Sequence, residues 1–159
     1  MQIRLIVVGR LKEKYWQDAI NEYRKRLAPW AKVEVFEVAE ERLPENPAAA
    51  EIETGLRKEG ERIDKLLSAG HIVVPLVIEG SQLSSEGLAN YIRKQSLEGK
   101  SQIAFIIGGS HGLAPEVIRK GNFSLSFSLM TFPHQMMRVV LMEQLYRAFS
   151  IIKGGKYHK

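Results

Sequence analysis

The sequence predicts an α/β fold with a mostly parallel sheet. Short apolar runs, typical of buried strands, occupy residues 2–9, 32–39, 72–79 and 103–107, and an alternating strand is expected at 123–127. Longer amphipathic stretches, typical of helices, lie between and after them, at residues 14–27, 46–68, 84–97 and 133–153. Alternation of strands and helices along one chain is the pattern of α/β proteins.

Composition limits what kind of protein this is. With 159 residues, no repeats and no evident linker, the chain is expected to form one domain spanning residues 1–159. No apolar run approaches the ~20 residues of a membrane helix, and the chain enters a strand pattern at once, which leaves no room for a signal peptide. The absence of cysteine excludes disulfides and thiolate chemistry, and it fits a location in the reducing cytoplasm.

The charge distribution is compatible with a nucleic-acid partner but does not require one. The net charge is +5, and the helix expected at 14–27 carries several lysines and arginines on one face. This face is either simply solvated or in contact with RNA. The second strand contributes an acidic edge that would repel phosphate, made by Glu34, Glu37, Glu40 and Glu41.

Two expected elements contain residues that disfavour regular structure. The helix after Asn46-Pro47 is expected to begin there, with Asn46 as N-cap, and to be mobile or loosely packed because Gly55 and Gly60 each weaken it by about 1 kcal/mol. The strand at 72–79 is expected to be fully buried, yet Pro75 cannot donate a ladder hydrogen bond. Leu76, which follows it, is expected to line a pocket.

A ligand pocket is predicted from two unusual loops. The buried strand 103–107 ends in the glycine-rich turn 108–112, whose main-chain N–H groups lie open to a ligand. The strand 123–127, expected to lie beside it, ends in the apolar and hydroxylated loop 128–132. Ligands bind at the carboxyl ends of strands in open α/β sheets, and an apolar loop of this kind suits an adenine-like ring.

Several common chemistries are excluded by missing motifs. The first strand ends at Gly9 without the further glycines of a dinucleotide-binding fingerprint, and the chain has no Walker loop and no Gly-x-Ser-x-Gly elbow. The four histidines have neither metal-binding spacing nor a neighbouring pair of carboxylates, so no metal site is expected; they are His71, His111, His134 and His158.

The C-terminal region combines a broad apolar helix with a basic tail. His134 and Arg138 lie one turn apart directly after the apolar loop. The apolar face of the helix 133–153 is either core or the seam of a homodimer. The chain ends in a basic segment with one tyrosine and one imidazole, Tyr157-His158-Lys159.

Four motifs, taken together and in order, resemble those of one known family. They are Ile107-Gly108-Gly109-Ser110-His111-Gly112, the stretch from Leu129 to Arg138 that reads LMTFPHQMMR, Glu143-Gln144-Leu145-Tyr146-Arg147-Ala148, and Tyr157-His158-Lys159. This combination is similar to the ribosomal large-subunit methyltransferase H family, also called YbeA-like, in the SPOUT superfamily. The resemblance extends over nearly the whole length of the chain.

The resemblance implies a cytoplasmic enzyme of rRNA processing that uses S-adenosylmethionine to methylate N3 of a pseudouridine in 23S rRNA. It implies a three-layer α/β sandwich with a C-terminal trefoil knot, and a homodimer with the cofactor held in the knot. Carried across by motif, the cofactor contacts are Leu76, Gly108, Phe127, Ser128, Leu129, Met130, Thr131 and Phe132.

Roles for the catalytic residues follow from the same resemblance and from the chemistry of a ring nitrogen. His158 is the candidate base, Lys159 and Arg138 are expected to stabilise negative charge, and Tyr157 is expected to stack on a base. The tail of one subunit is expected to complete the site of the other. Relatives commonly have proline where this chain has Lys156, so the path of the tail is left open.

Two other functions compete with methylation as an explanation of the sequence. A non-catalytic factor that binds RNA or the ribosome would keep the fold without turnover, but it would not need an apolar cofactor loop. An ordinary dinucleotide-binding enzyme is disfavoured by the missing glycines after Gly9. The modest net charge also leads us to expect that two copies together present the basic surface that contacts an assembled ribosome.

Overall fold

The sheet is entirely parallel. The computed structural model describes residues 1–158, and in this range it has one five-stranded sheet of order β2-β1-β4-β3-β5. The strands are β1 (Gln2–Val8), β2 (Lys32–Val38), β3 (Ile72–Gln82), β4 (Gln102–Ile107) and β5 (Leu125–Ser126).

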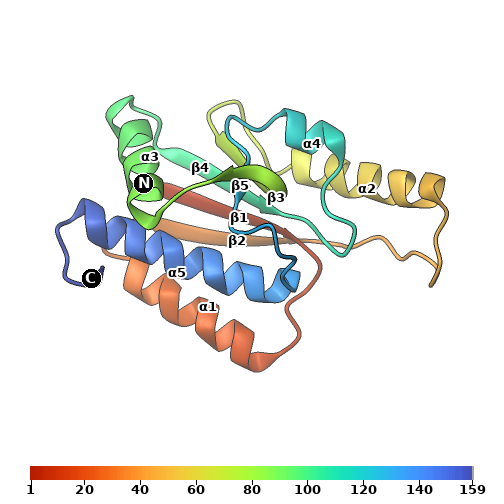
Figure 1. The fold of residues 1–159 in the computed structure, drawn as a ribbon, viewed down its shortest axis with the longest axis horizontal. Helices are drawn as coiled ribbons and strands as arrows, with labels where there is room; N and C mark the ends of the chain where they lie inside the picture. The colour runs from red at the N-terminus through yellow and green to blue at the C-terminus, as the bar shows by residue number, and fades with distance from the viewer. Residues whose placement is uncertain (159) are drawn as a thin grey trace.

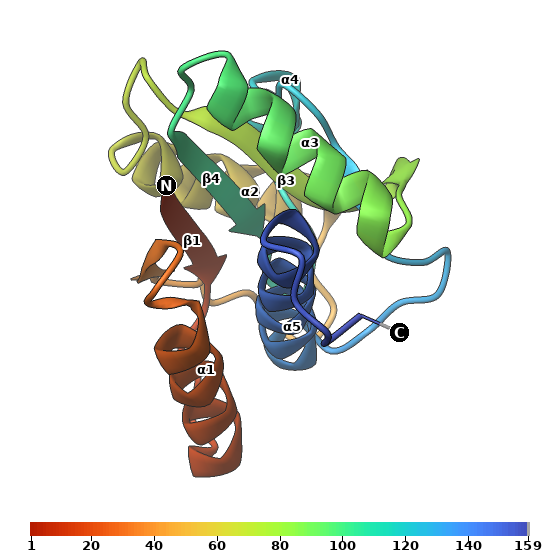
Figure 2. The same cartoon turned by 90° about the vertical axis from the view of Figure 1, so that its left-hand side faces the viewer.

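Helices cover both faces of the sheet and make three layers, as Figures 1 and 2 show. The helices are α1 (Lys14–Leu27), α2 (Ala49–Asp64), α3 (Ser85–Leu97), α4 (Pro115–Arg119) and α5 (His134–Ile152). Apolar residues of α1, α3 and α5 pack in one core, and those of α2 and α4 pack in a second core on the opposite face. The α/β prediction and the expected layers are confirmed. No helix in residues 1–158 is long and apolar enough to span a bilayer.

Strand β1 shows how the sequence builds both cores. Ile3, Leu5 and Val7 point into the core that contains α1, α3 and α5, whereas Ile6 and Val8 point into the other. All five side chains are fully buried. A strand that is apolar on both faces is expected in a parallel sheet covered by helices on each side.

The two strands that precede the unusual loops are not neighbours, contrary to the sequence prediction. Strand β3 lies between β4 and β5, and β5 is only two residues long instead of spanning 123–127. The pairing of β5 with β3 also shifts register between Leu76 and Ser81. Because every strand is parallel, the carboxyl ends of β3 and β4 still lie at one edge of the sheet.

Pro75 is accommodated inside β3 because its nitrogen faces away from β4. The main-chain N–H of Val73, two residues earlier, points to the same side of the strand as the Pro75 nitrogen. It donates to Asn122 Oδ1 over 2.8 Å, outside the pairing with β4. On that side Gly121 lies against the Pro75 ring, and a Cβ at Gly121 would stand only 2.7 Å from Pro75 Cδ. Burial ends at Pro75, so the prediction of a fully buried strand was wrong for its second half.

Helix α2 differs from the sequence prediction at its start and in its packing. It begins at Ala49, not at Pro47, because the Glu51 carboxylate accepts the Ala48 N–H over 2.8 Å and caps the helix there. Its two glycines are buried: Gly55 packs on Leu43, and Gly60 packs on Val117 of α4. The glycines therefore allow close packing, and the expectation of a loosely packed segment was wrong.

Candidate active site

A cavity of about 510 Å³ opens where β4 ends, beside residues 76–79 in the middle of β3. Its walls combine main chain from two loops with apolar side chains from β3, β5 and α5. A volume of this size and a mostly apolar lining are typical of small-molecule sites. The lining residues are Leu76, Val77, Ile78, Glu79, Ile107, Gly108, Gly109, Ser110, His111, Gly112, Leu113, Ile118, Leu125, Phe127, Ser128, Met130, Thr131, Phe132, His134 and Met137.

The first wall is the turn 108–112, which closes on itself. Gly109 and Gly112 form an isolated antiparallel bridge, and the Gly112 N–H donates to the Gly109 carbonyl over 3.1 Å. A Cβ at Gly108 would lie 2.2 Å from the Gly112 carbonyl oxygen, so only glycine fits there. Gly112 has a φ of 82°, a conformation that side chains other than glycine rarely adopt.

Glu40, in the loop after β2, anchors this turn from outside the cavity. Its Oε1 accepts the Ser110 hydroxyl over 2.9 Å and the Ser110 N–H over 3.3 Å. The other acidic residues predicted to form a phosphate-repelling edge also have partners within the chain. Glu34 forms an ion pair with Lys32, Glu37 with Arg138 and Glu41 with Arg62. Sequence reasoning missed the role of Glu40 because its partner is seventy residues away.

The second wall is the loop 128–132, which is held by serines and is only partly covered. Ser126 Oγ donates to the Ser128 carbonyl over 3.2 Å, and Ser128 Oγ accepts the Met130 N–H over 3.0 Å. Met130 remains 73% exposed and Phe132 40% exposed in the single chain. Apolar side chains left open at the rim of a cavity are suited to cover a ligand or a partner surface.

The residues proposed for cofactor binding gather at this cavity with one exception. Leu76 and Gly108 both line it, as do five of the six residues from 127 to 132. Leu129 is the exception: it is not among the lining residues and is 79% exposed. Glu79 contributes a carboxylate to the lining that sequence reasoning missed, since nothing near it in the sequence marks a site.

Arg138 is placed inside the fold and does not line the cavity. Its side chain is 1% exposed, and Nη2 donates to the carbonyls of Val8 and Gly9 over 2.9 and 3.0 Å. Its Nη1 donates to Glu37 Oε1 over 3.3 Å. Burial lowers the pKa of the Arg138 guanidinium, and Glu37 acts in the opposite direction. These contacts tie the first turn of α5 to the end of β1.

The C-terminal tail folds back along α5. Gly154, with a φ of 69°, and Gly155 reverse the chain, and the Gly155 N–H donates to the Ser150 carbonyl over 2.8 Å. Tyr157 then packs edge-on against Tyr146, with ring centroids 4.7 Å apart. Lys156, the residue that departs from the expected proline, is exposed within this turn.

Two residues of α5 hold the tail through hydrogen bonds and stacking. The Tyr157 hydroxyl donates to Glu143 Oε1 over 3.2 Å, and Arg147 lies 4.7 Å from the centre of the Tyr157 ring. His158 lies between Arg147 and Glu86 of α3. Lys159, the remaining predicted catalytic residue, lies outside the described residues.

Within one chain the tail does not reach the cavity. The cavity contacts α5 at His134 and Met137, whereas the tail contacts it at Glu143, Tyr146 and Arg147. The nearest of these positions, Met137 and Glu143, are six residues apart, which is roughly 9 Å along the axis at 1.5 Å per residue. The structure thus brings together the cofactor-binding candidates and, separately, Tyr157 and His158.

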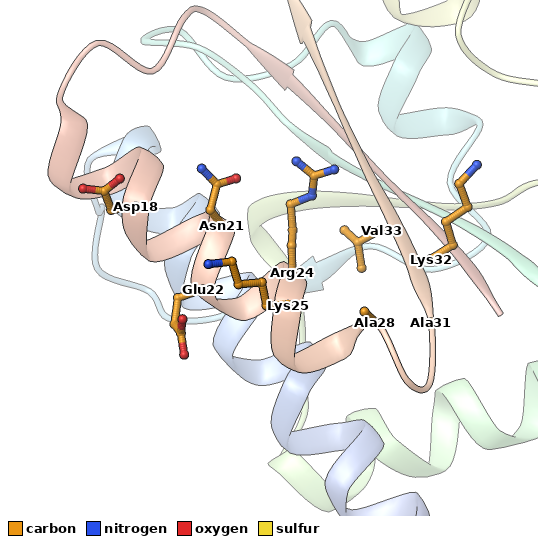
Figure 3. Close-up of a pocket in the computed structure, with 9 residues that line it drawn as sticks. All are labelled: Asp18, Asn21, Glu22, Arg24, Lys25, Ala28, Ala31, Lys32 and Val33. Carbon is orange, nitrogen blue, oxygen red and sulfur yellow. The ribbon is translucent and has the colours of Figure 1, made fainter.

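A second and larger concavity, of about 810 Å³, lies between α1 and β2 and is shown in Figure 3. Surface side chains of both signs line it, including Asp18, Glu22, Arg24, Lys25 and Lys32. It has no glycine-rich turn and no convergent main-chain donors, so we place the candidate site in the smaller cavity. Nor does any group of three or more His, Cys, Asp or Glu in residues 1–158 form a metal-binding cluster.

Comparison with known families agrees with this geometry. The family described as "Predicted SPOUT methyltransferase" matches residues 1–158. The chain belongs to this family. SPOUT methyltransferases use S-adenosylmethionine as methyl donor, so the match assigns the chain to methyl transfer, whereas it leaves the acceptor open.

One solved structure has a similar fold. It is described as that of "a probable methylase family protein from Haemophilus influenzae Rd KW20". It is 14% identical with a TM-score of 0.56, and the match covers 99% of this chain and 70% of the other. At this identity the likeness concerns the fold alone.

Proposed function

We propose that this SPOUT methyltransferase belongs to the ribosomal large-subunit methyltransferase H family and methylates N3 of a pseudouridine in 23S rRNA of the assembled ribosome. The observation that carries the proposal is the meeting of two sequence motifs at one cavity. The Gly108 turn and the loop 128–132 are separated by fifteen residues that include strand β5, and both line the space at the end of β4. The acceptor itself rests on the motif resemblance.

The cavity residues fit S-adenosylmethionine by their chemistry. Leu76, Ile107 and Phe127 offer apolar surface for the adenine ring, and the turn 108–112 offers main-chain groups for its polar edge. Glu79 offers a carboxylate for the amino group or the ribose hydroxyls. When bound, the cofactor supplies a methyl group on a sulfonium, which leaves as a neutral thioether after the methyl passes to nitrogen.

The chain's own residues would then provide alignment and proton removal. Tyr157 would stack on the target base or its neighbour, and His158 would accept the proton of the ring N–H. Lys159 would stabilise the charge that develops on the base. Arg138 was assigned a similar role, but its guanidinium is turned to main-chain carbonyls in this chain, so we propose that it acts by fixing α5.

A homodimer would join the two separated halves of the site. If two α5 helices pack antiparallel, the tail at the end of one helix lies near the start of the other, which is where the cavity opens. The exposed Leu129, Met130 and Phe132 provide an apolar rim for such a partner. Two copies also double the positive charge available to rRNA.

We also propose that residues 1–159 form one cytoplasmic methyltransferase domain whose C-terminal part is knotted. Close approach of main chain around Gly108, Gly121 and Pro75 is compatible with segments crossing there. Limited proteolysis tests the single domain, because it should leave one resistant core and no separable halves.

Mass spectrometry of 23S rRNA tests the acceptor. Ribosomes from cells that lack this protein should gain one methyl group on a pseudouridine when they are incubated with the purified chain and S-adenosylmethionine. Methylation of a different nucleotide would contradict the acceptor, and methylation of naked 23S rRNA at the same rate would contradict the need for an assembled ribosome.

Calorimetry separates the enzyme from a non-catalytic ribosome-binding factor. The purified chain should bind S-adenosylmethionine, and replacing the cofactor by NAD should give no heat. A chain that binds ribosomes but shows no affinity for S-adenosylmethionine would favour the non-catalytic factor.

Removal of the tail tests the role of Tyr157 to Lys159. Deletion of these three residues should abolish methylation while the affinity for S-adenosylmethionine stays within about twofold, because neither Tyr157 nor His158 lines the cavity of its own chain. Unchanged turnover would exclude the tail from the reaction.

A further inference from the structure

We propose that Glu86 is the positioning residue of His158: it selects the tautomer of the imidazole and favours the proton-accepting role of that side chain. This inference rests on the proposed function, since it assigns Glu86 a part in the same methyl transfer. It concerns a residue of α3, fifty residues or more from the motifs that identify the tail.

The His158 ring is held between one acid and one guanidinium. His158 Nε2 lies 2.6 Å from Glu86 Oε1, a short contact of the kind that involves an ionised partner. On the other side His158 Nδ1 lies 3.4 Å from Arg147 Nη1. The ring is therefore contacted at both nitrogens by charged side chains from two different helices.

These two contacts determine which nitrogen carries the hydrogen. Arginine can only donate, so Nδ1 facing Arg147 must be the acceptor, and the hydrogen of the neutral ring then lies on Nε2. Nε2–H donates to the Glu86 carboxylate, because an ionised carboxylate accepts hydrogen bonds and cannot donate them. The neutral ring thus keeps its lone pair at Nδ1, and Nδ1 is the atom able to take a proton.

Arg147 does not occupy Nδ1 firmly. Its distance of 3.4 Å exceeds the usual range for such a hydrogen bond, whereas Arg147 Nη2 and Nε donate to Glu143 Oε1 over 2.7 and 3.0 Å. The guanidinium is therefore bound mainly to Glu143, and its contact with the imidazole is long and weak. A substrate N–H can replace it at Nδ1 without breaking the stronger pair.

Glu86 is itself fixed in the ionised form. It lies in the first turn of α3, two residues after the N-cap Ser84, whose hydroxyl accepts the Gly87 N–H over 3.0 Å. The pKa of Glu86 is lowered, first by a hydrogen bond from its own main-chain N–H, then by His158 and Ser84. A helix N-terminus favours a carboxylate in its first turn.

The charges around His158 oppose one another. Glu86 favours the imidazolium, and Arg147 disfavours it; Glu143 partly neutralises Arg147, and Tyr157 and Lys156 are its tail neighbours. In the reaction the substrate N–H bond breaks, its electron pair stays on nitrogen, and the proton forms a new bond to Nδ1. The resulting imidazolium donates from Nε2 to Glu86, which compensates for Arg147.

Glu86 and His158 belong to one chain, which matters for a shared site. In the contacts described, the tail packs on its own subunit, against α3 and α5, with Tyr23 of α1 beside Tyr157. Glu86 would therefore accompany His158 to the cavity of the partner subunit. In the dimer the acid and the base come from one copy and the cofactor cavity from the other.

The test combines the pH dependence of methylation with NMR titration of the His158 ring in full-length protein. Glu86→Gln keeps an acceptor but removes the charge, so the imidazole should lose its proton at lower pH. The pH at which activity is half-maximal on the acid side should therefore fall, and the plateau rate should fall roughly tenfold. The NMR signal of the His158 ring should move in the same direction as the activity profile.

Three controls show whether Glu86 acts through His158. Glu98→Gln, at the opposite end of α3, removes an exposed acid paired with Lys100 and should leave both midpoints unchanged. Glu86→Asp should restore part of the rate. In a His158→Ala background, Glu86→Gln should cause no further loss of activity.

Several outcomes would overturn the assignment. If the NMR midpoint moves but the activity profile does not, Glu86 does not position the base. If the NMR midpoint stays in place, the contact does not exist in solution. Absence of any methylation by the unaltered protein would instead overturn the proposed function, and the assignment with it, whatever the NMR titration shows.

Discussion

The two ends of α5 are surrounded by different kinds of chemical group. At the first end, His134 and Met137 face a cavity whose other walls combine main chain with apolar side chains, and the Arg138 side chain is buried against two carbonyls. At the second end, Glu143, Arg147 and the tail form a half-exposed network of charged and aromatic side chains. The first end is therefore fixed by a buried arginine, whereas the second is held by side-chain contacts that are partly open to solvent.

This difference indicates that the two ends serve different steps of the proposed reaction, cofactor binding and contact with the RNA base. Main chain enclosed by a sheet edge holds one ligand in a constant shape, which suits a cofactor. Side chains on a short tail can change partners, which suits a group that must meet an RNA base. Cofactor binding and turnover should therefore respond to changes at different ends of one helix.

The largest expected effect is at the turn of the cavity. Gly108→Ala would place a methyl group 2.2 Å from the Gly112 carbonyl oxygen, so the turn must open and the cavity change shape. Affinity for S-adenosylmethionine, measured by calorimetry, should fall by about 100-fold or more. Gly70→Ala is the matched control, because nothing lies within 4 Å of a Cβ there. Equal affinities would show that the turn does not shape the site.

The next effect concerns the buried arginine. Arg138→Met leaves the buried carbonyls of Val8 and Gly9 without their donor, and should lower the free energy of unfolding by about 2 to 4 kcal/mol. Urea denaturation measures this loss. Arg119→Met removes an exposed arginine paired with Glu116 and should change stability by less than about 0.5 kcal/mol. A similar small change for both would mean that Arg138 does not hold α5 to β1.

A smaller effect separates neighbours in the apolar loop. Met130 lines the cavity and Leu129 does not, although both are strongly exposed without a ligand. Met130→Ala should weaken binding of S-adenosylmethionine about tenfold through lost apolar contact, whereas Leu129→Ala should leave it unchanged. If Leu129→Ala weakened cofactor binding more than Met130→Ala, the loop would adopt a different arrangement around the ligand.

The smallest effect is at the tail end and depends on pH. Burial, followed by Tyr23 and Glu143, raises the pKa of Tyr157 above its ordinary value of 10.0, so the folded tail favours the neutral phenol. This stabilisation is complete below pH 10 and is lost as the pH rises through the raised value. Urea unfolding at pH 9 and pH 11 should therefore show a loss of less than about 1 kcal/mol, smaller in Tyr157→Phe. A larger loss in Tyr157→Phe would contradict this direction.

Much of the fold could be predicted because its signals are local. The stripe with Ile20 and Leu27 marks α1, Ser84 marks the start of α3, and the apolar run 103–107 marks β4. The predictions failed where distant residues decide the outcome. Gly55 and Gly60 looked like weak points, but they pack on Leu43 and Val117, which no local pattern reveals.

The candidate site divides in the same way. Gly108 and the loop 128–132 could be identified because glycine clusters and exposed apolar loops are unusual in themselves. Glu40, Glu79 and Glu86 could not, since each is an ordinary surface acid until the fold places it beside Ser110, the cavity or His158.

The sequence by itself determined the strands and helices, the missing thiol and dinucleotide chemistry, and the motifs of a methyltransferase, because these depend on residue type and short spacing. Only the tertiary structure decided that β3 separates β4 from β5, that Arg138 is buried, and that Tyr157 and His158 pack outside the cavity of their own chain. These outcomes depend on how elements far apart in the chain pack together, and packing is not encoded at any single position.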